Sequence, residues 1–160
     1  MFVGLSSGVN YVREATMAFG NLSSGFSIFG WSSAGEESQD ELYKEVLLMT
    51  LAGASKADAN IHPVEIETIQ QIMQRETGQD FEAADIRKAS RPDLHESARL
   101  RKYLRSVQGR LNDKNKTTIL RALVDVIKSD TEINVLEIDF FNRVADALRI
   151  TPAEQVELTA

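Results

Sequence analysis

The sequence predicts an all-α fold, a bundle of about seven helices in which helical hairpins repeat with pseudo-two-fold symmetry. From Glu36 onward, apolar residues recur every three or four positions, which is the period of an amphipathic helix. No segment shows the sustained two-residue alternation of a half-buried strand. Residues that favour helix ends separate the apolar segments at short intervals, so we expect short connections between helices.

Residues 1–35 differ from the rest and are expected to form an irregular N-terminal arm. They hold six of the nine glycines, which argues against a long regular helix, and one short helix is expected around Asn10–Phe19. They also hold six of the eleven aromatic residues, which argues against a fully solvated tail. The arm therefore packs either on the chain's own core or on a second subunit, and the latter would make a homodimer.

Residues 36–160 are expected to form one helical domain, and its first repeat spans about residues 40–80. Asp40, or Ser38 before it, is a suitable cap for a helix that ends near Asp58. Pro63 suits the first position of the next helix, and Gly78 is expected to end it. The predicted apolar faces hold Leu42, Val46, Met49, Gly53 and Ala54 in the first helix and Ile66, Ile69, Ile72 and Met73 in the second.

A basic crossover, residues 81–111, is expected to join the two repeats. Asp80 can cap a short helix over residues 81–89, Pro92 breaks the chain, and Asp93 can start a longer helix that continues to Leu111. Residues 87–121 hold eleven basic and three acidic residues, a net charge of +8 in a chain whose total is −6. We expect the bases to be solvated or paired internally, with Leu100, Leu104, Val107 and Leu111 buried, and we do not expect this segment to bind nucleic acid or membranes.

The second repeat spans about residues 112–158. Asn112 or Asp113 is expected to cap one helix and Asn134 the next, and the segment from Thr151 to Glu154 is a capping box that opens a last short helix. The buried residues of the first two helices are expected to be Ile119, Leu123, Val126, Ile127, Ile138, Phe141, Val144, Ala145 and Leu148.

The pattern K-x-D-x-x-I-x-x-x-E occurs twice, from Lys56 and from Lys128, at an offset of 72 residues. The same offset pairs apolar residues on both sides of the motif: Leu47 with Ile119, Leu48 with Leu120, Leu51 with Leu123, Ile66 with Ile138, Ile69 with Phe141 and Ile72 with Val144. Each copy therefore predicts a helix, a loop of about five residues and a second helix. Ile61 and Ile133 are expected to plug the mouths of the two hairpins.

Helix capping explains part of this motif. Glu65 and Glu137 fall at the third helical position, where each carboxylate can reach back to the N–H of the cap residue, His62 or Asn134. Capping does not explain Asp58 and Asp130, because a carboxylate at the C-terminal end of a helix is unfavourable against the helix dipole. An exposed N–H, a lysine such as Lys56 or Lys128, or a cation is therefore expected beside each aspartate.

A divalent cation is the alternative interpretation. The candidate ligands are Asp58, Asn60 and Glu65 in one copy and Asp130, Glu132 and Glu137 in the other. All of them bind through oxygen, which suits Ca²⁺, Mg²⁺ or Mn²⁺. Neither loop is an EF-hand, because Pro63 and Val135 stand where that loop needs glycine.

Other kinds of site find no support in the sequence. The absence of cysteine excludes disulfides and thiolate metal sites and suits a cytoplasmic protein. The chain has no apolar run long enough to span a bilayer, and no signal peptide is expected because Arg13 and Glu14 interrupt the N-terminal apolar residues. The chain also has no phosphate-binding loop, no nucleophile elbow and no H-E-x-x-H motif, so we do not expect an enzyme.

The duplicated D-x-x-I-x-x-x-E motif in an all-helical domain resembles the TerB-like tellurite-resistance family, from about Glu41 to the C-terminus. The resemblance implies a cytoplasmic helical bundle linked to tellurite and general stress resistance, with a divalent-cation role for Asp58, Glu65, Asp130 and Glu137. The chain differs from the family where a glycine would follow each aspartate, since Ala59 and Thr131 stand there. We expect a non-enzymatic module that binds a cation, or a scaffold for an unknown protein partner in which the motif only caps helices.

Overall fold

The computed structural model describes residues 39–55, 63–95, 97–129, 133 and 135–159. They belong to one compact unit, Ser38–Ala160. Their secondary structure consists of the α-helices α2 to α8 and two short 3₁₀ segments, η1 and η2, which confirms the predicted all-α class. The arm at residues 1–35 and the helix expected at 10–19 lie outside the described residues, and the division of the chain near residue 35 stays a prediction.

The first hairpin consists of α2 (Gln39–Ala54) and α3 (Pro63–Thr77). The prediction that Asp40 caps α2 is wrong: Asp40 lies inside the first turn, where it pairs with Lys44 one turn later at 2.8 Å. The alternative cap, Ser38, lies outside the described residues. From Leu42 onward α2 is buried on every side rather than on one face, Lys44 excepted, which makes it the central helix of the unit.

Helix α3 begins and ends where local signals predict. Pro63 is its first residue, where a missing N–H breaks no helical hydrogen bond. Gly78 follows its last residue with a φ of +70°, and the Gly78 N–H donates to the Gln74 carbonyl oxygen at 2.8 Å. This left-handed end is a position that glycine adopts without strain. The four predicted apolar residues of α3 are buried.

The crossover contains α4 (Ala83–Ala89), η1 (Pro92–Leu94), α5 (Ser97–Val107) and η2 (Gln108–Arg110). Asp80 does not cap α4; the cap is Glu82, whose N–H donates to Asp85 Oδ2 at 3.3 Å. The single helix predicted from Asp93 to Leu111 is also wrong. The His95 and Leu111 N–H groups bond three residues back, so tight 3₁₀ turns stand on both sides of α5.

The second hairpin consists of α6 (Asp113–Ser129) and α7 (Val135–Ala147), and α8 (Pro152–Thr159) follows it. Asn112 caps α6, because its Oδ1 accepts the Asn115 N–H at 2.7 Å. The predicted capping box of α8 is present: Glu154 Oε2 accepts the Thr151 N–H at 2.8 Å, and the Glu154 N–H donates to Thr151 Oγ1 at 3.4 Å. The Thr151 hydroxyl also donates to Glu154 Oε2 at 2.6 Å, and this bond, followed by that from the Thr151 N–H, lowers the pKa of Glu154 because both favour its charged form. The expected cap of α7, Asn134, lies outside the described residues.

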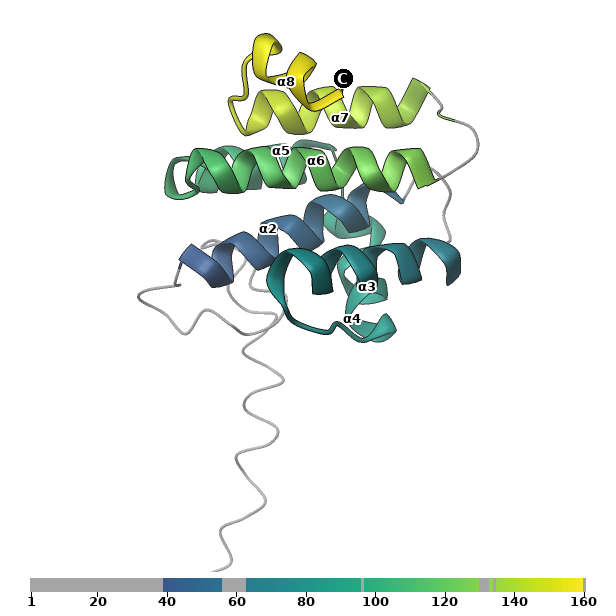
Figure 1. The fold of residues 1–160 in the computed structure, drawn as a ribbon. Coiled ribbons are helices and arrows are strands. Elements are labelled where there is room, and N and C mark those ends of the chain that lie inside the picture. The colour runs from purple at the N-terminus through teal and green to yellow at the C-terminus, as the bar shows by residue number, and fades with distance from the viewer. Residues whose placement is uncertain (1–38, 56–62, 96, 130–132, 134, 160) are drawn as a thin grey trace, which may run out of the picture. The chain divides into compact units, whose positions relative to one another are not determined.

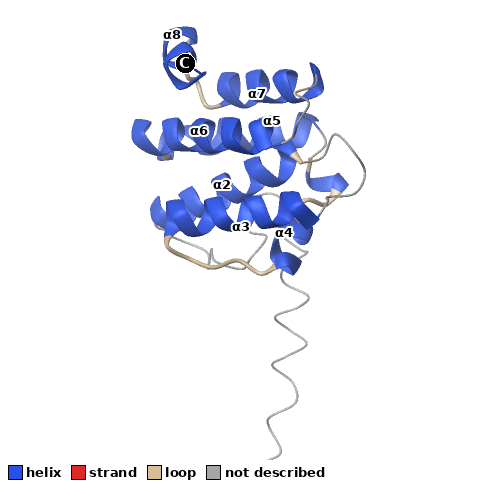
Figure 2. Ribbon diagram, turned by 45° about the vertical axis from the view of Figure 1, so that its right-hand side comes forward, coloured by secondary structure: helices blue, strands red, loops and turns tan. Residues whose placement is uncertain are grey.

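Figure 1 shows how the two hairpins stack: α2 and α6 lie side by side in the middle, α3 packs on the outer side of α2, and α7 on the outer side of α6. The view in Figure 2 shows the same layers. Helix α4 covers α2 and α3, α5 packs against α7, and α8 packs against α6. Both α3 and α7 begin at the same end of the stack (Figure 1). We call each copy of the duplicated motif, residues 58–65 or 130–137, a corner.

The hydrophobic pairs of the repeat lie in the core of this stack, with one exception. Ile66 is 4% exposed, whereas its counterpart Ile138 is 51% exposed, so the predicted burial of Ile138 is wrong. Ile133 does not plug the second hairpin either, since it is 54% exposed. The first turns of the two helices bury different residues: α7 buries Glu137 and exposes Ile138, whereas α3 buries Ile66 and leaves Glu65 half-buried. Ile61, the counterpart of Ile133, lies outside the described residues.

Candidate functional site

Two glutamates mark the duplicated corners. Glu65 is the third residue of α3 and Glu137 the third residue of α7, as the sequence predicts. A carboxylate in the first turn of a helix is favoured by the unpaired N–H groups and by the helix dipole, typically by about 0.3–1 kcal/mol. The bundle thus presents two equivalent carboxylates at the same end of the stack (Figure 1).

The two glutamates differ in burial. Glu65 is half-buried, whereas Glu137 is only 9% exposed and belongs to the buried side of α7. A buried carboxylate is stable only when hydrogen bonds or positive charges compensate for its lost hydration. Both glutamates interact with other groups of the chain.

The other four candidate ligands, Asp58, Asn60, Asp130 and Glu132, lie outside the described residues. So do His62 and Asn134, the expected partners of the glutamates in capping. Within the described part of the chain, no three acidic or histidine side chains gather closely enough to hold a metal ion. The proposed ligand set is therefore represented here by one first-turn glutamate per corner.

A buried polar pair links the crossover to the core, and the sequence reasoning did not find it. The hydroxyl of Tyr103 in α5 donates to Oε1 of Glu45 in α2 at 2.5 Å, and the two residues are 4% and 2% exposed. Glu45 is a charged residue type in the interior of the most buried helix of the unit. The signal that would have found it is its place in α2, where it lies directly before the apolar run from Val46 to Leu48.

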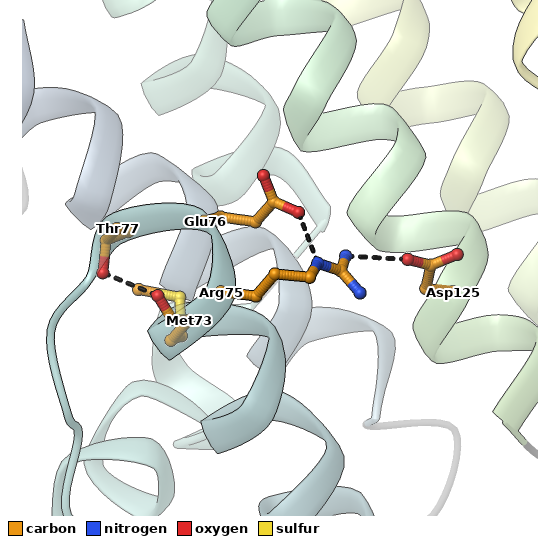
Figure 3. Close-up of polar contacts among 5 residues, drawn as sticks. All are labelled: Met73, Arg75, Glu76, Thr77 and Asp125. Atoms are coloured by element: carbon orange, nitrogen blue, oxygen red, sulfur yellow. Dashed lines mark hydrogen bonds and ion pairs between the residues drawn. The ribbon is translucent and has the colours of Figure 1, made fainter.

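Arg75 connects the two hairpins. Its Nη2 lies 2.9 Å from Asp125 Oδ2 in α6, and its Nε lies 2.7 Å from Glu76 Oε1, as Figure 3 shows. In the same view Thr77 Oγ1 donates to the Met73 carbonyl oxygen at 2.6 Å. The hydrogen bonds to Glu76 and Asp125 raise the pKa of Arg75 above its ordinary value, so it stays charged.

Tyr43 lies beside this charged group. Burial, followed by the negative charges of Glu76 and Asp40, raises the pKa of Tyr43 to about 12. The Tyr43 hydroxyl is therefore neutral over the whole physiological range and is suited to a structural role rather than to acid–base chemistry.

The basic face of α5 is partly neutralised within the bundle. Asp146 of α7 accepts from Arg101 at 3.3 Å and from Arg105 at 3.2 Å. The four predicted apolar residues of this segment, Leu100, Leu104, Val107 and Leu111, are buried at 1–5% exposure. The segment therefore has the buried stripe and the internal pairing that the sequence predicts.

Comparison with models of protein families gives a match over most of the chain. Residues 44–160 match the family model described as tellurite resistance protein TerB, and that range covers well over half of the chain. The chain belongs to the TerB family. No curated protein and no solved structure gives a significant match.

Membership makes this chain a tellurite-resistance-type module and confirms the resemblance found in the sequence. The TerB match begins in α2 and includes both hairpins, the basic crossover and α8, while the N-terminal arm lies outside it. Both motif positions at which the TerB-like pattern has glycine, Ala59 and Thr131, lie outside the described residues. Among the described residues, no helix of the TerB domain is long and apolar enough to cross a membrane.

Proposed function

We propose that this TerB domain is a non-enzymatic stress-response module whose two acidic corners bind a divalent cation, Ca²⁺, Mg²⁺ or Mn²⁺. The observation that carries the proposal is the placement of Glu65 and Glu137 at the same position of α3 and α7, directly after the two duplicated loops. The ligands would be Asp58, Asn60 and Glu65 in one corner and Asp130, Glu132 and Glu137 in the other. Such oxygen ligands suit these hard cations.

The physical argument for a cation rests on the charges that each corner gathers. In the sequence each corner joins an aspartate that follows one helix to a glutamate in the first turn of the next. The predicted end of the first helix near Asp58 is wrong, because α2 ends at Ala54, whereas α6 ends at Ser129, directly before Asp130. The helix dipole favours both glutamates and disfavours a carboxylate that directly follows a helix, as Asp130 does in the sequence. A cation bound between them would compensate the aspartate and would use the glutamate as a second ligand.

The test is a calorimetric titration of the full chain with Ca²⁺, Mg²⁺, Mn²⁺ and Zn²⁺. We expect saturable binding of at least one of the first three ions, and we expect it to disappear in the double variant Asp58→Ala plus Asp130→Ala. The matched control is Asp80→Ala plus Asp113→Ala, which removes the same charge from two exposed positions outside the corners. The proposal would be overturned if the chain bound none of the four ions, or if the control variant lost binding to the same extent.

The second candidate is a protein–protein interaction scaffold in which the glutamates only cap helices. It is favoured by a group of large apolar side chains at the start of α7 that are more than half exposed: Ile133, Val135, Leu136 and Ile138. Exposed apolar groups gathered in one region often contact another molecule. The partner to test first is a second copy of the chain, because the aromatic arm at residues 1–35 also predicts self-association.

Light scattering and denaturation separate the two candidates. The scaffold predicts that deletion of residues 1–35, or the substitution Leu136→Asp, lowers the number of chains per particle, obtained from the molar mass of the particle and that of the chain. An unchanged number of chains in both variants would contradict it. It also predicts that Glu65→Ala and Glu137→Ala each lower the free energy of unfolding by about 0.5–2 kcal/mol, with no dependence on added metal. If the loss appears only when metal is present, the cation proposal is supported instead.

A further inference from the structure

A small pocket lies between α5 and α7, and neither Glu65 nor Glu137, the two corner glutamates that the structure describes, lines it. Its apolar wall consists of Leu100 and Leu104 from α5 with Phe140 and Val144 from α7. Its polar lining consists of Arg101, Arg143 and His95. The cavity volume is about 40 Å³, and the pocket is partly open to solvent. Since one water needs about 10–15 Å³ on this measure, the space admits a group of a few heavy atoms.

The mixed lining follows from the spacing of residues on the two helices. Leu100 and Leu104 are four residues apart in α5, as are Phe140 and Val144 in α7, so each pair lies on one helix face. Arg101 and Arg143 each adjoin one of these apolar residues in sequence, and their side chains are 49% and 42% exposed. The pocket therefore combines an apolar wall with two guanidinium groups that also reach solvent.

His95 forms a fixed part of the lining. Its Nε2 lies 2.5 Å from the Ala89 carbonyl oxygen, and because a carbonyl only accepts, this nitrogen carries a proton. A Cβ placed on Gly53 would come within 2.9 Å of His95 Nδ1 and 2.8 Å of Phe140 Cζ. Backbone groups of α2 and α4 thus hold the imidazole in place against the aromatic ring.

The charges around the pocket favour an anion. Arg101 and Arg105 share the single carboxylate of Asp146, and Arg143 pairs with Asp139 at 3.1 Å. Two guanidinium groups line the pocket, and no carboxylate belongs to the lining that the structure describes. Ion pairs at this exposure are weak, so a bound anion competes with them at little cost in free energy. Guanidinium groups also match the planar geometry of a carboxylate better than ammonium groups do.

We propose that this pocket binds a small monocarboxylate, with its charged group between Arg101 and Arg143 and its short apolar portion against Leu104 and Phe140. The small volume favours a short ligand, the apolar wall favours an organic acid over an inorganic ion, and the two arginines select for negative charge. This binding site is separate from the cation proposal, because it uses none of the proposed cation ligands and neither of the described corner glutamates lines the pocket.

The test is a titration of the ¹⁵N-labelled full chain with sodium butyrate, followed by amide chemical shifts. We expect saturable shifts in α5 and α7 with butyrate and none with butyramide, its neutral analogue. Arg101→Gln and Arg143→Gln are each expected to weaken butyrate binding about tenfold or more, as the loss of a charge-assisted hydrogen bond predicts. Circular dichroism and the melting temperature check that both variants remain folded.

The matched control is Arg105→Gln. This residue also pairs with Asp146 from the same helix but does not line the pocket, so its loss should change the affinity for butyrate by less than about twofold. Three results would overturn the proposal: no saturable shift, equal shifts with butyramide, or equal weakening in the Arg105→Gln control. Inorganic phosphate that binds as tightly as butyrate would overturn it as well, because the apolar wall would then contribute nothing.

Discussion

Tyr103 of α5 donates a hydrogen bond of 2.5 Å to Glu45 of α2, and both residues are almost fully buried. A polar group in a core is stable only while its hydrogen bonds are made, so this pair ties the crossover to the central helix in one arrangement. The pair connects residues 58 positions apart. It is a direct polar link between the crossover and α2, and its removal has a measurable consequence.

We expect Tyr103→Phe to lower the free energy of unfolding by about 1–3 kcal/mol, because it removes a donor from a buried acceptor. The double variant Tyr103→Phe plus Glu45→Leu should regain part of this loss, since both polar partners are then absent. Urea denaturation followed by circular dichroism gives both values. A loss below about 0.5 kcal/mol in the single variant would show that the pair does not stabilise the core.

At Gly53 the backbone of α2 comes close to His95 of the crossover and to Phe140 of α7. A Cβ there would lie 2.8 Å from Phe140 Cζ, which is shorter than ordinary van der Waals contact. We expect Gly53→Ala to lower the free energy of unfolding by about 1–2 kcal/mol, because overpacking exceeds the gain in helix propensity. Replacing the aromatic ring by a smaller side chain, in the double variant Gly53→Ala plus Phe140→Leu, should recover part of the loss.

Gly109 provides the control for this substitution, because a Cβ there meets no atom within 4 Å and its φ is not positive. We expect Gly109→Ala to be neutral or to stabilise by up to about 1 kcal/mol, through the lower entropy of the unfolded chain. Thermal denaturation of both alanine variants is the measurement. Equal losses at the two positions would contradict the packing argument.

Two helix ends have left-handed residues, but only one of them is glycine. After α7, Arg149 has a φ of +58°; its N–H donates to the Asp146 carbonyl oxygen at 3.1 Å, and the Ile150 N–H donates to that of Ala145 at 3.0 Å. This is a Schellman end, a position that glycine favours. We expect Arg149→Gly to raise the free energy of unfolding by about 0.5–1 kcal/mol. Glycine relieves the backbone strain of a positive φ, and this gain exceeds the cost of the additional conformational entropy that glycine loses on folding.

Gly78, with a φ of +70°, should respond in the opposite direction. A Cβ added at this residue would meet no atom within 4 Å, so Gly78→Ala tests backbone strain alone. We expect a loss of about 1 kcal/mol in the free energy of unfolding. The urea midpoints of the two variants should therefore move apart, and movement in the same direction would refute the assignment of strain to these two residues.

The raised pKa of Tyr43 predicts how the free energy of unfolding changes at alkaline pH. Its folded-state pKa is about 12 and its ordinary value is 10.0, so above pH 10 the unfolded chain loses the phenolic proton more readily than the folded chain. The stabilising contribution of neutral Tyr43 is complete below pH 10 and is lost as the pH rises toward 12. We expect Tyr43→Phe to flatten this part of the stability profile.

Urea denaturation at several pH values between about 9 and 11 measures this effect, which follows from linkage. The variant should lose less stability over that interval than the native chain. Identical slopes in the two proteins would mean that another group governs the alkaline dependence.

Local sequence signals determined four helix ends in the described part of this protein. Pro63 begins α3, Gly78 follows its end, Asn112 caps α6, and Thr151 with Glu154 opens α8. Each of these signals works within about one helical turn, so a single stretch of sequence contains all the interacting groups. The duplicated motif likewise placed Glu65 and Glu137 at the third positions of their helices.

Only the tertiary structure decided which faces are buried and which distant residues meet. Ile66 and Ile138 occupy matching positions of the repeat, yet only Ile66 is buried, because the packing of the helices and not the local sequence decides which face of a helix is covered. The same reason explains why the sequence did not reveal the pair of Tyr103 and Glu45 or the pocket between Arg101 and Arg143. Repeated sequence specifies repeated hairpins, whereas different helices pack on each of them: α4 on the first hairpin, and α5 and α8 on the second.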